Sequence, residues 1–139
     1  MNKYAEMISE LKTPELMKRL TYLYGQRDGM LVAQTMRYTR LLKRHEDVVN
    51  APGVVYMISA PGRTEIGGNH TDHNRGKTLA AAVNLDTLAA VTPRGDMQVN
   101  IHSEGYAPLS LSLEDLGPRE EEKGATAALV RGVAARMKE

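Results

Sequence analysis

The segment from Ala60 to Gly76 (APGRTEIGGNHTDHNRG) gathers nearly every type of hydrogen-bonding side chain within about a dozen positions. Carboxylates only accept hydrogen bonds, arginines only donate, asparagines do both, and a neutral histidine does one of each. Such a mixture suits the hydroxyl groups of a small molecule such as a sugar, but a segment rich in glycine, asparagine and aspartate is more often an ordinary polar loop. The glycines in this segment permit backbone conformations that other residues resist. The chemistry-bearing side chains are Arg63, Glu65, Asn69, His70, Thr71, Asp72, His73, Asn74 and Arg75.

A metal site and a phosphate loop are two other readings of such a segment. His70, Asp72 and His73 lie close together, with His102 further on, but no second spaced pair completes a tetrahedral set of ligands. We therefore predict no metal site here. Nothing in the sequence matches G-x-G-x-x-G or G-x-x-x-x-G-K-[ST], so neither kind of phosphate-binding loop is present.

Length, charge and composition narrow the class of protein. The 139 residues fit one ordinary globular domain, and 42% of them are hydrophobic. The net charge of +1, from 18 basic and 17 acidic residues, gives no electrostatic reason to expect a nucleic-acid or membrane partner. The absence of cysteine excludes disulfides and thiolate chemistry and is compatible with a reducing cytoplasm. No apolar run approaches the roughly 18 residues of a membrane helix.

The first 50 residues are predicted to be helical. One helix begins at Thr13-Pro14, where a capping side chain precedes a first-turn proline, and ends at Gly25. A second helix covers about 29–46. We interpret the basic residues of the second helix as a solvated face rather than a phosphate-binding patch. These residues are Arg37, Arg40, Lys43 and Arg44.

Strands and one further helix are predicted after the turn at 50–53. β-rich or alternating segments indicate strands, and they are separated by polar or glycine-rich connections. The order of helices, then strands, then a helix favours an α+β fold with a mainly antiparallel sheet. We predict strands at 54–59, 78–85, 87–92, 97–102 and 109–114, a loop from Ala60 to Gly76, a charged loop at 117–123 and a helix at 125–138.

The polar segment resembles the signature of the galactokinases, which are members of the GHMP small-molecule kinase family. Ala60-Pro61-Gly62-Arg63 and the later Gly68–Asn74 stand where that signature reads approximately A-P-G-R-V-N-L-I-G-E-H-T-D-Y-N. The resemblance is colinear from about residue 50 to the end, and it includes Val130–Val133, which is similar to the family's V-R-G-V segment. It implies a helical segment at 1–50 and an incomplete GHMP kinase N-terminal domain, ribosomal protein S5-like in fold, at 51–139.

The resemblance also implies roles for individual residues. Arg63 matches the arginine that lies next to the sugar's anomeric hydroxyl and stabilises negative charge during phosphoryl transfer. Ser103 matches a position near the nucleotide. The positions of the sugar-binding E-H-T-D sequence are occupied here by Asn69, His70, Thr71 and Asp72.

Three positions depart from the signature, and they concern the choice of sugar. Asn69 replaces a glutamate, Glu65 replaces an asparagine and His73 replaces a tyrosine. A hydrogen bond to a charged group contributes about 1.5–3 kcal/mol, against about 1 kcal/mol for a neutral one, so Asn69 changes the recognition of one hydroxyl. The implied substrate is therefore galactose or a related sugar.

The remaining parts of such a kinase are missing from the sequence. In the family, a loop reading P-x-G-x-G-L-S-S-S-A, the catalytic aspartate and the Mg²⁺ ligands all follow the V-R-G-V helix. We therefore expect this chain to be the front portion of a cytoplasmic kinase that uses ATP and Mg²⁺, and to be inactive by itself. The alternative is a sugar-binding regulatory relative that does not catalyse phosphoryl transfer.

Overall fold

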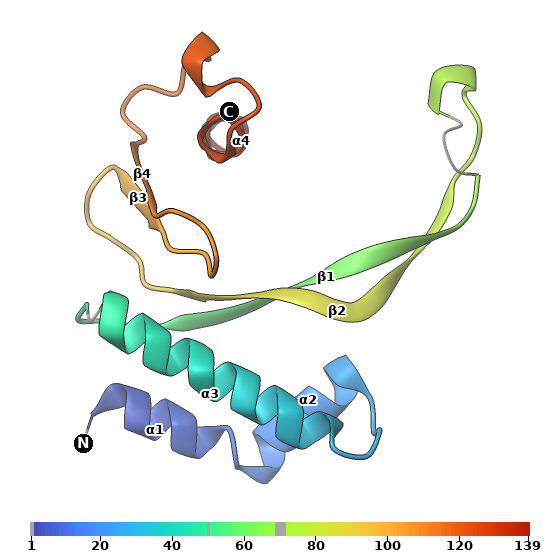
Figure 1. Ribbon diagram of the computed structural model, residues 1–139, viewed down its shortest axis with the longest axis vertical. Helices are drawn as coiled ribbons and strands as arrows, with labels where there is room; N and C mark the ends of the chain where they lie inside the picture. Colours follow the sequence, from blue (N-terminus) through green and yellow to red (C-terminus); the bar gives the residue numbers. More distant parts are fainter. Residues whose placement is uncertain (1, 50, 69–71) are drawn as a thin grey trace. The chain divides into compact units, whose positions relative to one another are not determined.

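The computed structural model describes residues 2–49, 51–68 and 72–139. The chain divides into two compact units, Met1–Pro93 and Arg94–Glu139. The first unit contains the N-terminal helices and a long β-hairpin, and the second contains a short β-hairpin and a helix (Figure 1). The elements of the first unit are α1 (Lys3–Glu10), α2 (Pro14–Tyr24), α3 (Met30–Val48), β1 (Tyr56–Gly67), η1 (Asp72–Asn74) and β2 (Leu79–Val91).

Local signals set the ends of α2. The Thr13 side chain accepts a hydrogen bond from the Leu16 amide at 3.4 Å, and Pro14 occupies the first turn. Gly25 ends the helix with a φ of 83°, a left-handed angle that favours glycine. The predicted helices at 13–25 and about 29–46 are confirmed.

β1 and β2 form a long antiparallel hairpin that is more regular than the sequence predicts. The loop predicted from Ala60 onward is wrong for residues 60–67, which continue β1 and pair with β2. The two strands predicted at 78–85 and 87–92 are likewise one strand. Each strand supplies the backbone partners that the other needs. Of the glycines that suggested a loop, Gly62 lies at a register shift and Gly67 is paired with Leu79.

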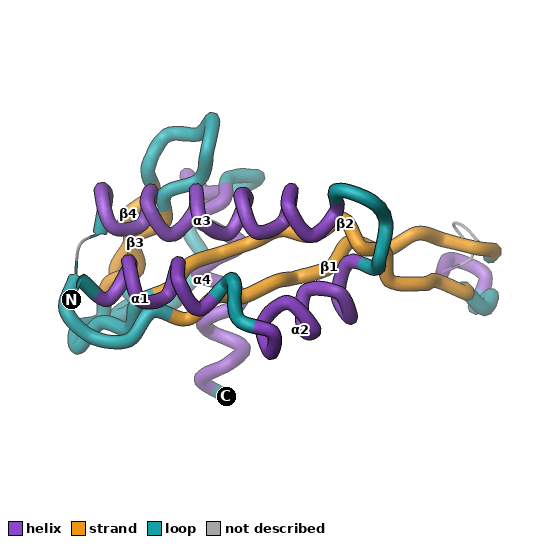
Figure 2. Tube along the Cα trace, turned by 90° about the horizontal axis from the view of Figure 1, so that it is seen from below, coloured by secondary structure: helices purple, strands orange, loops and turns teal. Residues whose placement is uncertain are grey.

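The core of the first unit lies between its helices and one face of the β1–β2 hairpin. Figure 2 shows α1, α2 and α3 lying across that face, and Figure 1 shows the same arrangement from the side. Met57, Leu88 and Ala90 of the hairpin pack against the core, whereas Tyr56 and Ile58 on the alternate positions of β1 are exposed. The buried apolar side chains are Tyr4, Leu11, Leu20, Tyr24, Tyr38, Leu42 and Val55.

The second unit has a smaller apolar interior. Its strands pair antiparallel, and Leu111 is the buried apolar side chain among residues 94–139. The strands predicted at 97–102 and 109–114 and the helix predicted at 125–138 are confirmed, as is the α+β class with antiparallel pairing. The elements of this unit are β3 (Gln98–Ile101), β4 (Leu109–Ser112), η2 (Glu120–Glu122) and α4 (Thr126–Lys138).

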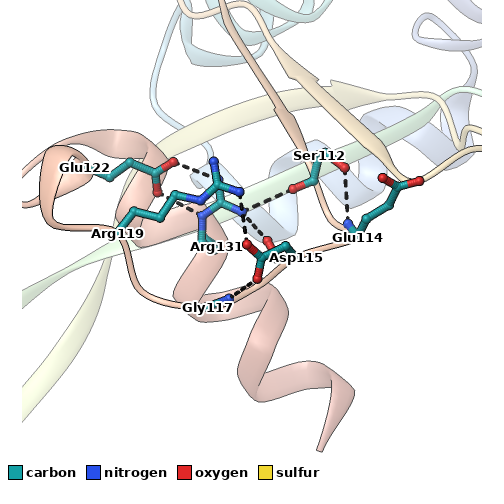
Figure 3. A network of polar contacts seen from close by, with 7 residues as sticks. All are labelled: Ser112, Glu114, Asp115, Gly117, Arg119, Glu122 and Arg131. Atoms are coloured by element: carbon teal, nitrogen blue, oxygen red, sulfur yellow. Dashed lines mark hydrogen bonds and ion pairs between the residues drawn. The ribbon is translucent and has the colours of Figure 1, made fainter.

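A buried arginine fastens α4 to the loop that precedes it (Figure 3). Arg131 donates to both carboxylate oxygens of Glu122, at 2.7 and 2.9 Å, and to the carbonyl oxygens of Ser112 and Asp115. Burial opposes ionisation of Glu122, but the hydrogen bonds from Arg131 are the larger effect and hold the pKa of Glu122 below its ordinary value. The charged loop predicted at 117–123 is therefore anchored by one side chain of α4.

Candidate functional site

The polar residues of interest lie at the far end of the β1–β2 hairpin. Arg63 is on β1, exposed, and paired with Ala82 across the hairpin. The ladder ends at the pair of Gly67 and Leu79, and the connecting loop follows. The paired strands β1 and β2 therefore carry both the arginine and the loop.

Gly68 closes the base of that loop. Its φ is +82°, and a Cβ added there would lie 2.1 Å from the carbonyl oxygen of Lys77, so a side chain does not fit. The Thr78 hydroxyl donates to the Gly68 carbonyl oxygen at 3.0 Å. Further along the loop, the Gly76 amide donates to the Asn74 side chain at 3.2 Å. The hydrogen bond from Thr78 to Gly68 thus joins the two ends of the loop, whereas the one between Gly76 and Asn74 is local to it.

The structure places the predicted sugar-binding residues only in part. Arg63 and Asp72 belong to the same hairpin, because Asp72 begins the η1 turn between β1 and β2. The other predicted sugar-binding residues lie outside the described residues, and they are Asn69, His70 and Thr71.

Ser103 lies in the other compact unit. It is exposed in the connection between β3 and β4, and its carbonyl oxygen accepts a hydrogen bond from the Tyr106 amide at 3.2 Å. This turn is local to the second unit. The predicted nucleotide contact of Ser103 stays a prediction.

Sequence reasoning missed a buried polar cluster in the first unit. The Asp86 side chain is 2% exposed and accepts hydrogen bonds from the Tyr24 hydroxyl at 2.6 Å, from the Ser59 hydroxyl and from the Arg37 guanidinium. Arg37 also donates to the Asp86 carbonyl oxygen at 2.8 Å, and Tyr38 lies 3.1 Å from Tyr24, oxygen to oxygen. The interpretation of Arg37 as a solvated residue is therefore wrong, because a buried carboxylate on β2 faces it.

The protonation states in this cluster are set by opposing effects. Burial would raise the pKa of Asp86, but the hydrogen bonds from Ser59, Tyr24 and Arg37, with the charge of Arg37, hold it below its ordinary value. Burial, together with the bond to Asp86, raises the pKa of Tyr24. Asp86 is thus an anion and Tyr24 a neutral donor. The available sequence signal was one acidic residue inside the apolar run 79–91.

A second buried polar contact joins α1, α3 and the end of β2. The Tyr4 hydroxyl lies 2.9 Å from Nδ1 of His45, and the Thr92 hydroxyl lies 3.3 Å from Nε2. Burial, and to a smaller extent the positive charge of Lys3, lowers the pKa of His45. The imidazole is therefore held in its neutral form.

Metal-binding groups and membrane helices were also sought in the part of the chain that the structure describes. There, no three or more histidine and acidic side chains gather closely enough to hold a metal ion. His70 is outside that part. Across the same residues, no helix combines the length and the apolar character that crossing a membrane requires.

A comparison with protein-family models finds a match to the segment that contains the β1–β2 hairpin. The family model described as the galactokinase galactose-binding signature matches residues 37–93. That range contains Arg63, the loop and the Asp86 cluster apart from Tyr24. No solved structure matches the chain.

Curated relatives agree with the family model. The chain is 33% identical over 83 residues to a galactokinase of Lacticaseibacillus casei, a match that covers 60% of this chain and 21% of that protein. It is 33% identical over 79 residues to a galactokinase of Enterococcus faecalis, covering 55% of this chain and 20% of the relative. A galactokinase of Limosilactobacillus reuteri is 35% identical over 68 residues, which is 49% of this chain and 17% of the relative.

The matches thus span about a fifth of the length of these curated relatives. Within that span, both comparisons point to one group of proteins, and the family model falls on the segment that sequence reasoning singled out. The resemblance to the galactokinases is therefore confirmed for the part of the chain that carries the galactose-binding signature.

Proposed function

We propose that this chain is the sugar-recognising part of a galactokinase-like sugar-1-kinase, which transfers the γ-phosphate of ATP to the anomeric hydroxyl of galactose or a related sugar. The observation that carries the proposal is the match of the galactose-binding signature to residues 37–93. The proposal includes a cytoplasmic location, a helical segment at 1–50 and an incomplete GHMP kinase N-terminal domain of S5-like fold at 51–139.

Arg63 has the catalytic role in this proposal. The sugar's anomeric oxygen attacks the γ-phosphorus, the bond to the ADP oxygen breaks, and negative charge builds up on the transferring group. A guanidinium keeps its positive charge at all relevant pH values, so Arg63 stabilises that charge without a proton transfer of its own. The proton of the sugar hydroxyl goes to a base outside this chain.

The loop at the hairpin end supplies the sugar contacts. Asn69, His70, Thr71 and Asp72 offer acceptors and donors that suit neighbouring hydroxyl groups. The closed loop base at Gly68 supports this assignment, because a binding loop gains affinity when its ends are already ordered.

ATP and Mg²⁺ are the other reactants in the proposal. Among the described residues, no cluster of histidine and acidic side chains fits Mg²⁺, and the sequence has no phosphate loop. In this proposal the Mg²⁺ ligands and most nucleotide contacts come from a part of the enzyme beyond this chain, and Ser103 lies near the nucleotide.

A coupled ATP-to-ADP assay tests the proposal. It would be run on this chain and on an extended polypeptide of the length of the curated galactokinases, with galactose, arabinose, galacturonate, N-acetylgalactosamine and glucose. We expect turnover only from the extended protein, with one sugar dominating. Arg63→Met in the extended protein should abolish that turnover while sugar binding, measured by calorimetry, persists.

One result of this assay would contradict the proposal. If the extended protein binds a sugar and releases no ADP, the kinase function is wrong and a sugar-binding regulatory function replaces it. Asn69 in place of the signature's glutamate fits this second function as well as it fits a changed sugar preference of a kinase, because it alters a binding position without bearing on phosphoryl transfer.

A further inference from the structure

The β1–β2 hairpin contains a bulge directly beside Arg63. Pro61 pairs with Asp86 and Arg63 pairs with Ala82, so Gly62 alone faces a longer stretch of β2 between these two pairs. That stretch is Val83, Asn84 and Leu85. The extra residues are on β2, and a bulge changes the local twist of the strand pair directly beside Arg63.

Helix α2 holds this bulge at two points through its last residue. The Tyr24 hydroxyl donates to Asp86, at the start of the bulge, at 2.6 Å. The Tyr24 carbonyl oxygen accepts from the Asn84 side chain, inside the bulge, at 3.2 Å. The side chain of Tyr24 thus binds Asp86, and its backbone carbonyl binds Asn84, two residues earlier on β2.

The other partners of Asp86 fix it against α3 and β1. Arg37 donates to both its carboxylate and its carbonyl oxygen, and Ser59 donates to the carboxylate from the opposite strand. Space at the bulge is also limited, because a Cβ added at Gly62 would lie 3.1 Å from the Leu85 carbonyl oxygen. The bulge is therefore constrained from both helices and from β1.

We propose that the cluster of Tyr24, Arg37, Ser59, Asn84 and Asp86 is a positioning device that holds the bulge and thereby sets the position of Arg63. These are positioning residues, since none of them is placed in contact with substrate. The expected effect on kcat rests on the proposed function, whereas the expected effect on the conformation of the bulge does not.

Two tyrosines of the same core provide a matched test. Tyr24→Phe removes the hydroxyl that reaches Asp86, and Tyr4→Phe removes an equally buried hydroxyl that reaches His45 instead. Asn84→Ala is a second variant at an exposed position, so it disturbs the bulge with little risk to folding.

The first measurement is a ¹H–¹⁵N correlation spectrum of this chain. Tyr24→Phe and Asn84→Ala should shift the amide resonances of Gly62 and Arg63, and Tyr4→Phe should leave them in place. The second measurement is steady-state kinetics of the extended protein. There we expect Tyr24→Phe and Asn84→Ala to lower kcat about tenfold with little change in KM, because a misplacement of about 1 Å can cost about a hundredfold in rate.

Equal effects of Tyr4→Phe and Tyr24→Phe on both readouts would overturn the proposal, because a general loss of core stability would then explain them. If the wild-type extended protein turns over no sugar, the proposed function fails on its own. The amide shifts of Gly62 and Arg63 then still decide whether the cluster holds the bulge.

Discussion

The two compact units of the chain differ in what they bury. In Met1–Pro93, several large apolar side chains pack together beneath the β1–β2 hairpin, and the Asp86 cluster is buried beside them. In Arg94–Glu139, the buried side chains are Leu111 and the charged Arg131. The first unit spreads its buried contacts over many apolar side chains, whereas the second has one buried leucine and one buried arginine.

This difference predicts how each unit responds to substitution. Truncating a buried apolar side chain lowers the free energy of unfolding by an amount that grows with the volume removed, and the whole core is destabilised. A polar anchor fails when one partner is lost, and the loss is confined to the segments that it joins. Four substitutions or changes of condition test this contrast between an apolar core and a polar anchor, from the largest expected effect to the smallest.

Leu42→Ala should have the largest effect. The side chain is 1% exposed at the centre of the first unit, and such truncations cost about 2–5 kcal/mol of unfolding free energy. Urea denaturation measures the loss. Leu129→Ala is the matched control, because that leucine is 68% exposed in the second unit and should change the free energy by less than about 0.5 kcal/mol. Equal losses from both variants would contradict the contrast.

Gly68→Ala should have the next largest effect, and it probes a part of the first unit outside the core. The added Cβ would meet the Lys77 carbonyl oxygen, and the positive φ adds strain, so we expect a cost of about 1–3 kcal/mol. Thermal unfolding measures it, and sugar binding should weaken. Gly95→Ala is the control, because nothing lies within 4 Å of its added Cβ. An unchanged melting temperature for Gly68→Ala would refute the closed loop base.

Arg131→Met should have a local effect. The variant removes the donors to Glu122, Ser112 and Asp115, so amide hydrogen exchange should speed up in residues 112–123 and stay unchanged in Met1–Pro93. Arg119→Met is the control, because Arg119 makes an exposed pair with Asp115. Faster exchange throughout both units would show that Arg131 is not a local anchor.

Lowering the pH should have the smallest effect. The pKa of His45 is depressed in the folded chain, so the neutral form stabilises the fold above the unfolded value of about 6.5. That contribution is lost as the pH falls through and below about 6.5, because the unfolded chain then binds a proton more readily than the folded chain. Urea midpoints measured across this pH range should decrease in the wild-type chain and in His102→Gln, which changes an exposed histidine. The decrease should be absent from His45→Gln. A decrease that persists in His45→Gln would assign the effect to another group.

Much of the local structure could be predicted because its signals lie within a few residues. The cap at Thr13, the stop at Gly25 and the alternation at 109–114 are short-range features, and the structure confirms the elements that they mark. The regularity of residues 60–67 could not be predicted in this way. Their glycines favour a loop locally, and only the partner strand, 12 to 27 positions later, makes them a strand.

For the candidate site too, the features carried by neighbouring residues could be predicted, and those assembled from distant residues could not. The types and order of residues in the polar segment were enough to indicate a galactokinase-like sugar site, because a linear signature needs no knowledge of the fold. The Asp86 cluster was not predictable, since its members come from α2, α3, β1 and β2 and are up to 62 positions apart. An acidic residue in an apolar run is a signal that something must neutralise it, but the sequence does not say what.

The sequence by itself thus determined the ends of α2, the class of fold and the resemblance of the polar segment to a known signature, because each depends on residues that are close together or on their order along the chain. Tertiary structure decided which charged side chains meet a partner across the fold. Arg37 pairs with the buried carboxylate of Asp86, whereas Arg40 and Lys43 on the same helix are exposed. The buried Arg131 pairs with Glu122. Burial of a charge depends on a partner brought from far along the chain, and that is a property of the folded molecule alone.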